Sequence, residues 1–341
     1  MNEPLDIPLP EGHAQARVSA VDRGAFRILN GLREVPAELA GKFYFLADAA
    51  DALPCVGDFV EAQYYDDDSA AIIHSLLPRR SFLRRRKAGE RVEYQMIAAN
   101  IDLAFIIQSC HFDFNIRRLD RYLVMAADGG VEPVILLSKT DLVTPEALTE
   151  MIAAVRTAGI SARILPLSNT TGAGMEEFRA LLTPGMTCCL LGSSGVGKTT
   201  LINRLLGREI LSTREVSATG EGTHTTSRRQ LIPLENGAMV IDTPGMRELG
   251  LLGASEGMEQ GFDEIQTLGS RCRYSDCRHV QEPGCAVRAA VSAGTLSQER
   301  YNNYLKLKKE SDYYEMSYLE KRRKDREFGR FINKALKQMK K

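Results

Sequence analysis

The stretch Cys189-Leu-Leu-Gly-Ser-Ser-Gly-Val-Gly-Lys-Thr-Thr-Leu201 is the most informative part of the chain. It contains the pattern G-x-x-x-x-G-K-[ST], whose fixed positions are Gly192, Gly197, Lys198 and Thr199. An apolar run precedes the pattern and a helix-like segment follows it. A glycine loop between a strand and a helix points its backbone N–H groups at phosphate, and the positive end of the helix adds to the attraction. The stretch therefore predicts a site for the phosphates of a nucleotide.

Each polar group of this loop has an expected partner on the nucleotide. Lys198 is expected to bind the β- and γ-phosphate oxygens and so to act in catalysis, and the hydroxyl of Thr199 is expected to bind Mg²⁺. The predicted nucleotide-binding residues of the loop are Gly192, Ser193, Ser194, Gly195, Val196, Gly197, Lys198, Thr199 and Thr200.

The composition is ordinary for a protein of several soluble domains. The chain has 341 residues, of which 44% are hydrophobic and 26% charged. No apolar run approaches the roughly 20 residues of a membrane-spanning helix, and the acidic start is unlike a signal peptide, so we expect a cytoplasmic protein. The formal net charge is zero, but residues 301–341 hold 13 Lys and Arg against 6 Asp and Glu. The neutral total thus hides a basic tail.

The first part of the chain predicts a small β-barrel. Five short segments, apolar or alternating, are separated by turn residues: 16–21, 25–29, 42–46, 59–64 and 70–76. Five strands at this spacing suggest an antiparallel barrel, of which the oligonucleotide-binding (OB) fold is one type. On periodicity alone, a barrel without nucleic-acid binding is an equal alternative.

A basic run, Arg79 to Arg91, follows the barrel. Contact with nucleic-acid phosphates is one natural use for such a run. A solvated linker between two domains is the equally good alternative.

From residue 100 the pattern changes to that of a parallel sheet. Continuous apolar runs at 101–108 and 131–137 flank a helical pattern at 116–127, which predicts a βαβ unit. Ser138-Lys139-Thr140-Asp141 follows the second run, at the end of a strand where an open α/β sheet binds ligands. The Asp141 carboxylate can accept hydrogen bonds from N1–H and N2–H of guanine but repels the acceptors of adenine. Ser168, after the next strand at 162–168, is expected to close over the base edge or else to be an ordinary turn residue.

Beyond the phosphate loop lie the groups expected to respond to the γ-phosphate. Asp242 ends an apolar run and is expected to hold Mg²⁺, and the N–H of Gly245 is expected to contact the γ-phosphate. The polar segment Thr219–Ser227 offers Thr225, or its neighbour Thr226, as a second hydroxyl ligand of Mg²⁺. Such a loop would be ordered by GTP and released by hydrolysis.

Three of the seven cysteines and one histidine lie close together near residue 280. Cys272, Cys277, His279 and Cys285 have the spacing C-x₄-C-x-H-x₅-C, and three thiols with one imidazole suit a structural Zn²⁺. The remaining cysteines stand in apolar contexts and are expected to be buried without a metal: Cys55, Cys110, Cys188 and Cys189. Thr295 to Gln298 resembles a capping box that starts a helix.

The order of these elements resembles that of the circularly permuted GTPases, because the base-reading residues precede the phosphate loop and Asp242. With the barrel and the cysteine knuckle, the chain resembles the ribosome small-subunit-dependent GTPase family, RsgA, also called YjeQ, from about residue 16 to about residue 309. The resemblance implies a GTPase that binds the small ribosomal subunit late in its maturation, contacts its rRNA and is stimulated by it. It also implies GTP or GDP, Mg²⁺ and one Zn²⁺ as bound groups.

Two positions need separate treatment within this resemblance. Ser138 stands where members of the family commonly have Asn, so guanine selectivity is expected to rest mainly on Asp141. Met246, after Asp242-Thr-Pro-Gly245, cannot orient water as the glutamine of Ras-like proteins does. The resemblance assigns that role to His224, with Thr225 beside it, and a surface histidine without a role is the alternative.

The expected architecture is therefore multidomain. Residues 1–80 are an OB-fold-like barrel, 81–95 a basic linker, 96–253 a circularly permuted α/β P-loop GTPase domain, and 254–341 a zinc-knuckle domain with a basic helical tail. The expected protein is a monomer without a membrane partner. Three alternatives stay open: an ATPase, a non-catalytic RNA-binding scaffold with a vestigial nucleotide site, and a permuted GTPase that acts on the large subunit.

Overall fold

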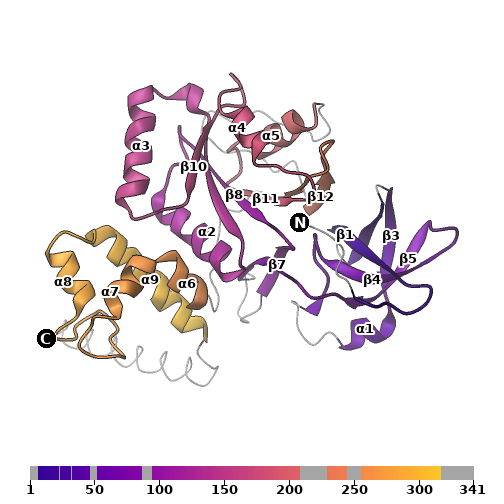
Figure 1. Cartoon of the computed structure of the whole chain (residues 1–341), viewed down its shortest axis with the longest axis horizontal. Coiled ribbons are helices and arrows are strands. Elements are labelled where there is room, and N and C mark those ends of the chain that lie inside the picture. The colour runs from indigo at the N-terminus through magenta and orange to yellow at the C-terminus, as the bar shows by residue number, and fades with distance from the viewer. Residues whose placement is uncertain are drawn as a thin grey trace, which may run out of the picture.

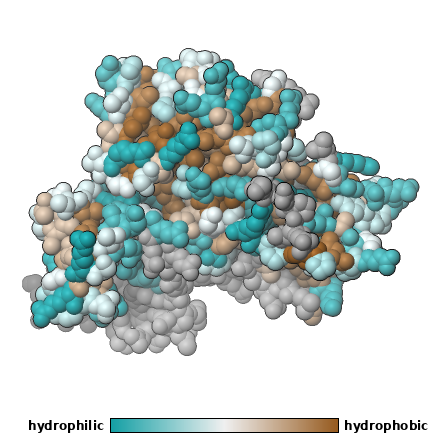
Figure 2. Space-filling model, viewed as in Figure 1, coloured by the Kyte–Doolittle hydropathy of each residue, from teal (hydrophilic) through white to brown (hydrophobic). Residues whose placement is uncertain are grey.

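The computed structural model describes residues 7–22, 24–31, 33–46, 52–86, 94–207, 229–243 and 255–315. Figure 1 shows three units, with an α/β unit between a barrel formed by the N-terminal strands and a group of helices near the C-terminus. In the face shown in Figure 2, hydrophobic residues gather over the centre of the α/β unit, while hydrophilic residues cover much of the outer surface of the barrel.

The barrel has five strands and one short helix. They are β1 (Ala14–Asp22), β2 (Ala25–Asn30), β3 (Arg33–Leu39), α1 (Gly41–Leu46), β4 (Phe59–Tyr65) and β5 (Ala70–Leu76). Strand β1 pairs antiparallel with both β2 and β4, β2 with β3, and β4 with β5, while β3 and β5 are parallel, so the sheet closes on itself. A closed five-stranded barrel agrees with the predicted OB-like fold.

One predicted strand of the barrel is wrong, and one strand was missed. Residues 42–46 belong to helix α1, and the third strand is instead β3. The run of four aromatic or apolar side chains from Phe43 to Leu46 shows neither an alternating nor a helical pattern in the sequence. In the helix, Phe43 packs on the barrel core while Tyr44 and Phe45 are exposed. In β3 only Val35 and Ala37 are buried, and Pro36 between them obscures the alternation.

The α/β unit contains a mostly parallel sheet in the order β10-β9-β8-β11-β13-β12. Its strands are β8 (Leu103–Ser109), β9 (Glu132–Ser138), β10 (Arg163–Leu167), β11 (Thr187–Gly192), β12 (Arg229–Pro233) and β13 (Met239–Asp242). All neighbours are parallel except β12, which runs antiparallel to β13. The predicted βαβ unit is confirmed, and β9 and β10 precede the phosphate-loop strand β11 in the chain, as a circular permutation requires.

Helices cover both faces of this sheet. They are α2 (Ile116–Asp128), α3 (Pro145–Thr157), α4 (Met175–Ala180) and α5 (Lys198–Leu205), with a 3₁₀ turn at Thr140–Leu142. Alternate residues of β8 enter different cores: Ile106 packs with α2 and α3, whereas Phe105 packs with α4 and α5. Two buried faces explain why the strands read as continuous apolar runs.

The expected basic linker is partly a pair of strands. Strand β6 (Phe82–Arg86) pairs antiparallel with β7 (Tyr94–Ala99). Arg84 of β6 is bound to Asp128 at the end of α2, with its Nε 3.1 Å from the carboxylate, and its guanidinium lies over the Tyr94 ring. This arginine therefore has a structural role in holding the pair against the α/β unit. The exact domain boundaries remain predictions.

The C-terminal helices are α6 (Ser255–Gly261), α7 (Asp263–Gly269), α8 (Ala286–Ser292) and α9 (Gln298–Glu315). The predicted capping residue of the last helix is wrong by two positions. Ser297 Oγ accepts the backbone N–H of Arg300 at 3.1 Å, whereas Thr295 Oγ1 donates back to Ala290 O. In the described part of the chain, no helix is long and apolar enough to cross a membrane.

A buried charge network fixes α9 against α2. Arg300 is 4% exposed, pairs with Asp120, donates to Glu264 at 2.7 Å and lies over the ring of Phe262. Asn303 also donates to Asp120. Farther along α9, Glu310 makes paired contacts with Arg121 of α2 at 2.9 and 2.6 Å, which add a more exposed connection. Charges buried this deeply are tolerated because each is paired and hydrogen-bonded.

The barrel and the α/β unit share one continuous sheet. Strand β1 pairs antiparallel with β12, with Ala20 opposite Gln230 and Val21 opposite Arg229. The full order is therefore β10-β9-β8-β11-β13-β12-β1-β2-β3-β5-β4. Two segments about 210 residues apart in the chain thus lie side by side.

Candidate nucleotide and metal sites

The phosphate loop has the geometry that its glycines predict. It connects β11 to α5, and its glycines Gly192, Gly195 and Gly197 all have positive φ, at 150°, 81° and 99°. A Cβ on Gly192 would lie 2.5 Å from Ile107 O, and one on Gly197 would lie 2.9 Å from Asn169 Nδ2. The backbone conformation therefore disfavours a side chain at both positions, and at Gly192 the close backbone carbonyl also leaves no space for one.

Lys198 arches back over this loop. It is 7% exposed, and its Nζ donates to Gly192 O and Ser193 O, both at 2.7 Å. Burial lowers the pKa of Lys198 to about 8, although the nearby carboxylates of Asp242 and Asp113 favour the charged form. A buried ammonium that donates to two carbonyls is suited to a phosphate ligand, which would supply further negative charge.

Asp242 ends strand β13 beside the phosphate-loop strand. It is 1% exposed and lies opposite Leu190 of β11 in the parallel pairing. The next residue, Thr243, donates from Oγ1 to Leu190 O at 2.5 Å and so fixes the strand end. Thr199, the predicted hydroxyl ligand, is half-buried at the start of α5. A buried carboxylate and a hydroxyl flanking the phosphate loop form an oxygen donor set that fits Mg²⁺.

The predicted base-reading residues are brought to the same edge of the sheet. Ser138 is 1% exposed, and its Oγ lies 2.8 Å from Val196 O in the phosphate loop and 3.3 Å from Gln108 O. Lys139 has a φ of 60°, which turns the chain sharply into the 3₁₀ turn that contains Thr140 and Asp141. Ser138 therefore joins the base-reading turn directly to the phosphate loop.

Ser168 orients Asp141. Its Oγ donates to Asp141 Oδ1 at 2.5 Å and accepts the N–H groups of Thr170 and Thr171 at 3.2 and 3.1 Å. Two incoming N–H donors leave the Ser168 proton for the carboxylate. The side chain of Ser168 thus contacts both its own turn and Asp141 of the neighbouring strand end, and its closure over the base remains a prediction.

The structure adds a residue that the sequence did not single out. Asn169 Nδ2 donates to Gly197 O at 3.1 Å, so the loop after β10 supports the phosphate loop as Ser138 does from β9. Its place directly after Ser168 at a strand end was the available signal, but its partner lies 28 residues away in the chain. The predicted residues His224, Thr225, Thr226, Gly245 and Met246 lie outside the described residues, so their roles remain predictions.

The four predicted metal ligands converge. The donor atoms of Cys272, Cys277, His279 and Cys285 all lie within 4.8 Å of one another. His279 Nδ1 is 3.6 Å from Cys272 Sγ and 3.5 Å from Cys285 Sγ, and the two sulfurs are 3.9 Å apart. Ligands of a tetrahedral Zn²⁺ are separated by about 3.6 to 3.8 Å, so the cluster fits that ion.

Groups around the cluster hold its ligands in place. The backbone N–H groups of Ala286 and Arg288 point at Cys272 Sγ and Cys285 Sγ, at 3.4 and 3.5 Å. Tyr301 of α9 donates to the carbonyl of His279 at 2.5 Å. Such outer contacts stabilise thiolates and fix ligand orientation. The other four cysteines are buried away from this cluster, as predicted.

Comparisons with known proteins agree with this geometry. A family model described as RsgA GTPase matches residues 76–252. A relative from Lactiplantibacillus plantarum, named small ribosomal subunit biogenesis GTPase RsgA 2, is 42% identical over 95% of this chain and 91% of its own length. The crystal structure of YjeQ from Thermotoga maritima is similar, with a TM-score of 0.64 and 26% identity over 86% of this chain and 97% of that one.

The crystal structure of YloQ, described as a circularly permuted GTPase, supports the fold. It matches with a TM-score of 0.61 and 22% identity over 90% of this chain and 98% of its own. The matched family model spans the residues that form the phosphate loop, the base-reading turn and Asp242. Together with the arrangement of these residues, the comparisons establish that the chain belongs to the RsgA GTPase family and is a circularly permuted GTPase.

Proposed function

We propose that this GTPase is a late maturation factor of the small ribosomal subunit, that the subunit stimulates its GTP hydrolysis, and that hydrolysis drives its release. The observation that carries the nucleotide part is the contact of Ser138 with Val196, which places the Asp141 turn against the phosphate loop. The printed name of the Lactiplantibacillus relative supports the partner.

Guanine selectivity rests on Asp141. Held by Ser168, its carboxylate accepts N1–H and N2–H of the base, while the lysine stem of Lys139 packs on the purine face. The Ser138 hydroxyl supports this turn by its hydrogen bond to the phosphate loop rather than by a contact with the base. ATP lacks both donors and meets a carboxylate in their place, which argues against the ATPase alternative.

The phosphates are held by the loop and by Lys198. When GTP binds, the Lys198 ammonium exchanges the carbonyls of Gly192 and Ser193 for phosphate oxygens. Thr199, Asp242 and one of the hydroxyls of Thr225 or Thr226 would hold Mg²⁺, which neutralises charge on the β- and γ-phosphates. Gly245 N–H contacts the γ-phosphate, and His224 orients the attacking water in place of a glutamine.

The Cys272, Cys277, His279 and Cys285 cluster would hold one Zn²⁺. Four protein ligands leave no open position, so its role is structural. It would secure the knuckle against α9, whose Tyr301 and Arg300 contact the knuckle and the α/β unit, respectively.

The expected RNA contacts lie on the barrel, on the basic segment 79–91 and on the basic tail beyond residue 315. The OB-like topology and the charge of these segments support rRNA as the ligand. We propose that the protein is a cytoplasmic monomer and that the small ribosomal subunit is its binding partner.

The test is co-sedimentation of the full chain with purified small and large subunits in the presence of a non-hydrolysable GTP analogue or GDP. Retention on the small subunit with the analogue, and loss with GDP, is the expected result. A His224→Ala variant should stay bound with GTP itself because hydrolysis is slow. Equal binding in both nucleotide states would favour an RNA-binding scaffold, and binding to the large subunit alone would contradict the assigned partner.

A further inference from the structure

Strand β12 lies between the barrel and the strand that ends in Asp242. Gln230 is paired with Ala20 of β1 on one side and with Asp242 of β13 on the other. The chain enters β12 directly from the segment 219–227 that the sequence predicts to sense GTP. The backbone of the barrel is thus one strand away from the carboxylate that would hold Mg²⁺.

Arg17 crosses the same junction with its side chain. It belongs to β1, is 5% exposed, and donates from NH1 to Met239 Sδ of β13 at 3.3 Å. It also donates from Nε to Gly57 O at 3.2 Å and from NH2 to Asn100 O at 3.1 Å. One guanidinium therefore donates to one part of the barrel and to two parts of the α/β unit.

The setting of Arg17 is unusual for a charged group. Its guanidinium lies 4.9 Å from the centre of the Phe59 ring, and burial lowers its pKa to about 10. The nearby carboxylates of Asp102 and Asp58 favour its charged form. Asp58, which lies in the turn, is bound by Arg79, with both contacts at 2.7 Å. The hydrogen bonds of this buried guanidinium go to two backbone carbonyls and a thioether on both sides of the junction, which points to a directional role.

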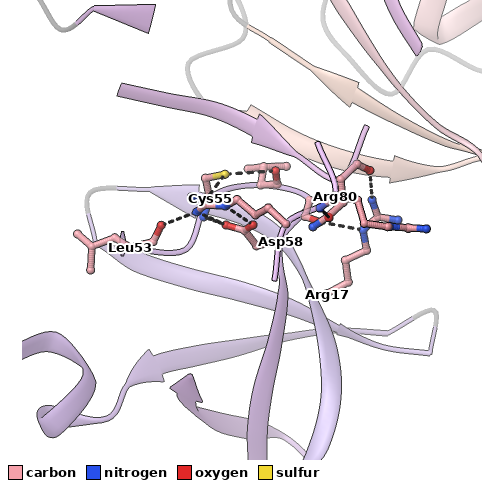
Figure 3. Close-up of polar contacts among 9 residues, drawn as sticks. Arg17, Leu53, Cys55, Asp58 and Arg80 are labelled. Carbon is pink, nitrogen blue, oxygen red and sulfur yellow. Dashed lines mark hydrogen bonds and ion pairs between the residues drawn. The ribbon is translucent and has the colours of Figure 1, made fainter. Parts of the chain in front are cut away.

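The turn that receives Arg17 is rigid and in close contact with the α/β unit. Figure 3 shows Cys55 and Asp58 in this turn, with Arg17 and Arg80 beside it. Asp58 Oδ2 accepts the N–H of Cys55 at 2.7 Å, and Asn100 Nδ2 donates to Gly57 O at 3.1 Å. A Cβ on Gly57 would lie 2.2 Å from Ala99 O and 3.2 Å from Ile241 in β13. A shift of the barrel therefore cannot be absorbed at this contact.

We propose that Arg17 is a positioning residue that, with the β1–β12 pairing, couples the barrel to Asp242. A ligand that displaces the barrel changes the position of β13 and hence the Mg²⁺ carboxylate. By reciprocity, nucleotide and Mg²⁺ change the stability of β1. This inference rests on the proposed function for the identity of the barrel ligand, but the coupling itself is present in the isolated chain.

The first test needs no variant. Hydrogen exchange of the full chain is followed at the amides of residues 17–22 with GDP and Mg²⁺, and with a GTP analogue and Mg²⁺. Slower exchange with the analogue is expected, because the coupled strand should respond to the state of the nucleotide site. Equal exchange in the two states, with both nucleotides bound, overturns the coupling. Failure to bind any guanine nucleotide would instead overturn the proposed function.

The second test uses Arg17→Met, which keeps an apolar stem on Phe59 but removes all three donated hydrogen bonds. Its matched control is Arg27→Met on the neighbouring strand β2, where the arginine pairs with Glu34 within the barrel. Arg17→Met should raise the Mg²⁺ concentration for half-maximal GTP turnover by about tenfold and remove the nucleotide-dependent exchange in β1. Affinity for GDP without Mg²⁺ should stay within about twofold.

Arg17→Lys keeps the charge but offers a single donor group, so it should show an intermediate Mg²⁺ requirement. This variant keeps the proposal testable if Arg17→Met does not fold. Arg27→Met should behave as the unaltered protein. An unchanged Mg²⁺ requirement in both folded Arg17 variants, or the same increase in Arg27→Met, overturns the assignment of Arg17.

Discussion

Ala20 of the barrel and Asp242 of the GTPase unit lie opposite the same residue, Gln230, from its two sides. Two strand spacings of about 4.8 Å place them about 10 Å apart. The strand of the barrel closest to the nucleotide site therefore belongs to the same sheet as the phosphate loop. Events at the barrel and at the nucleotide are connected through backbone hydrogen bonds rather than through a flexible linker.

Because Ser138 contacts Val196, we predict that removing the Ser138 hydroxyl lowers nucleotide affinity but leaves the selectivity for guanine unchanged. Ser138→Ala leaves the buried Val196 carbonyl without its 2.8 Å donor, which should cost about 1 kcal/mol, or roughly fivefold in affinity. Calorimetry with GDP and with ADP tests this. GDP affinity should fall while the preference over ADP remains, and a collapse of the preference would mean that Ser138 reads the base.

Ser168→Ala should weaken guanine recognition by releasing Asp141. The lost hydrogen bond to a charged group is worth about 1.5 to 3 kcal/mol, so GDP affinity should fall by about ten- to a hundredfold. The double variant Ser168→Ala/Asp141→Ala should bind GDP little worse than Asp141→Ala alone, because Ser168 acts through Asp141. Additive losses in this cycle would contradict that relationship.

Nucleotide affinity should depend on pH through Lys198. Its pKa in the free protein is lowered to about 8, so the ammonium form that binds phosphate is lost as the pH rises through that value. Affinity for GDP should be nearly constant between pH 7 and 7.5, and should then fall by up to about tenfold per pH unit above 8. The Lys198→Arg variant, which keeps its charge, should show a flat profile over pH 7 to 9. A flat profile in the unaltered protein would contradict the lowered pKa.

The knuckle should contain one zinc ion per chain. Cys277→Ser should lower the zinc content measured by atomic absorption from about one to well below one, because a neutral hydroxyl replaces a thiolate. Cys110→Ala, which changes a buried cysteine outside the cluster, should keep the metal. The same zinc content in both variants would contradict the ligand assignment.

The network around Arg300 should hold the C-terminal helices on α2. Arg300→Met leaves Asp120 buried without its partner and should lower the free energy of unfolding by about 3 to 5 kcal/mol. The control, Arg117→Met, breaks an exposed pair with Glu299 and should cost less than about 1 kcal/mol. Urea unfolding followed by circular dichroism measures both. Equal losses in the free energy of unfolding would mean that burial does not determine how much these ion pairs contribute to stability.

The convergence of the described groups of the proposed nucleotide site was predictable because they lie in short motifs whose geometry is local. The conformation of the phosphate loop follows from its own glycines. Asp141, Ser168 and Asp242 each follow an apolar run that can be recognised as a buried strand. The metal ligands span only 14 positions, from Cys272 to Cys285, so their spacing alone limits how they meet.

The rest depended on contacts between distant segments. Nothing near Arg17 indicates that Met239 and Asn100 are its partners, and a charged residue in an amphipathic strand is normally expected on the surface. Strand β3 was not recognised in the sequence because Pro36 interrupts its alternating pattern. Helix α1 is too short for its aromatic residues to show a helical period. The pairing of β1 with β12 carries no motif, since backbone hydrogen bonds between strands place few demands on residue type.

The most direct test of the account is the GTP turnover rate of the full chain measured alone, with purified small subunits and with purified large subunits at equal concentrations. We expect slow turnover by the chain alone, an increase of at least about tenfold with small subunits, and no comparable increase with large ones, because the free protein rarely populates its active conformation. The same slow rate under all three conditions, or stimulation by large subunits only, would contradict the proposed function.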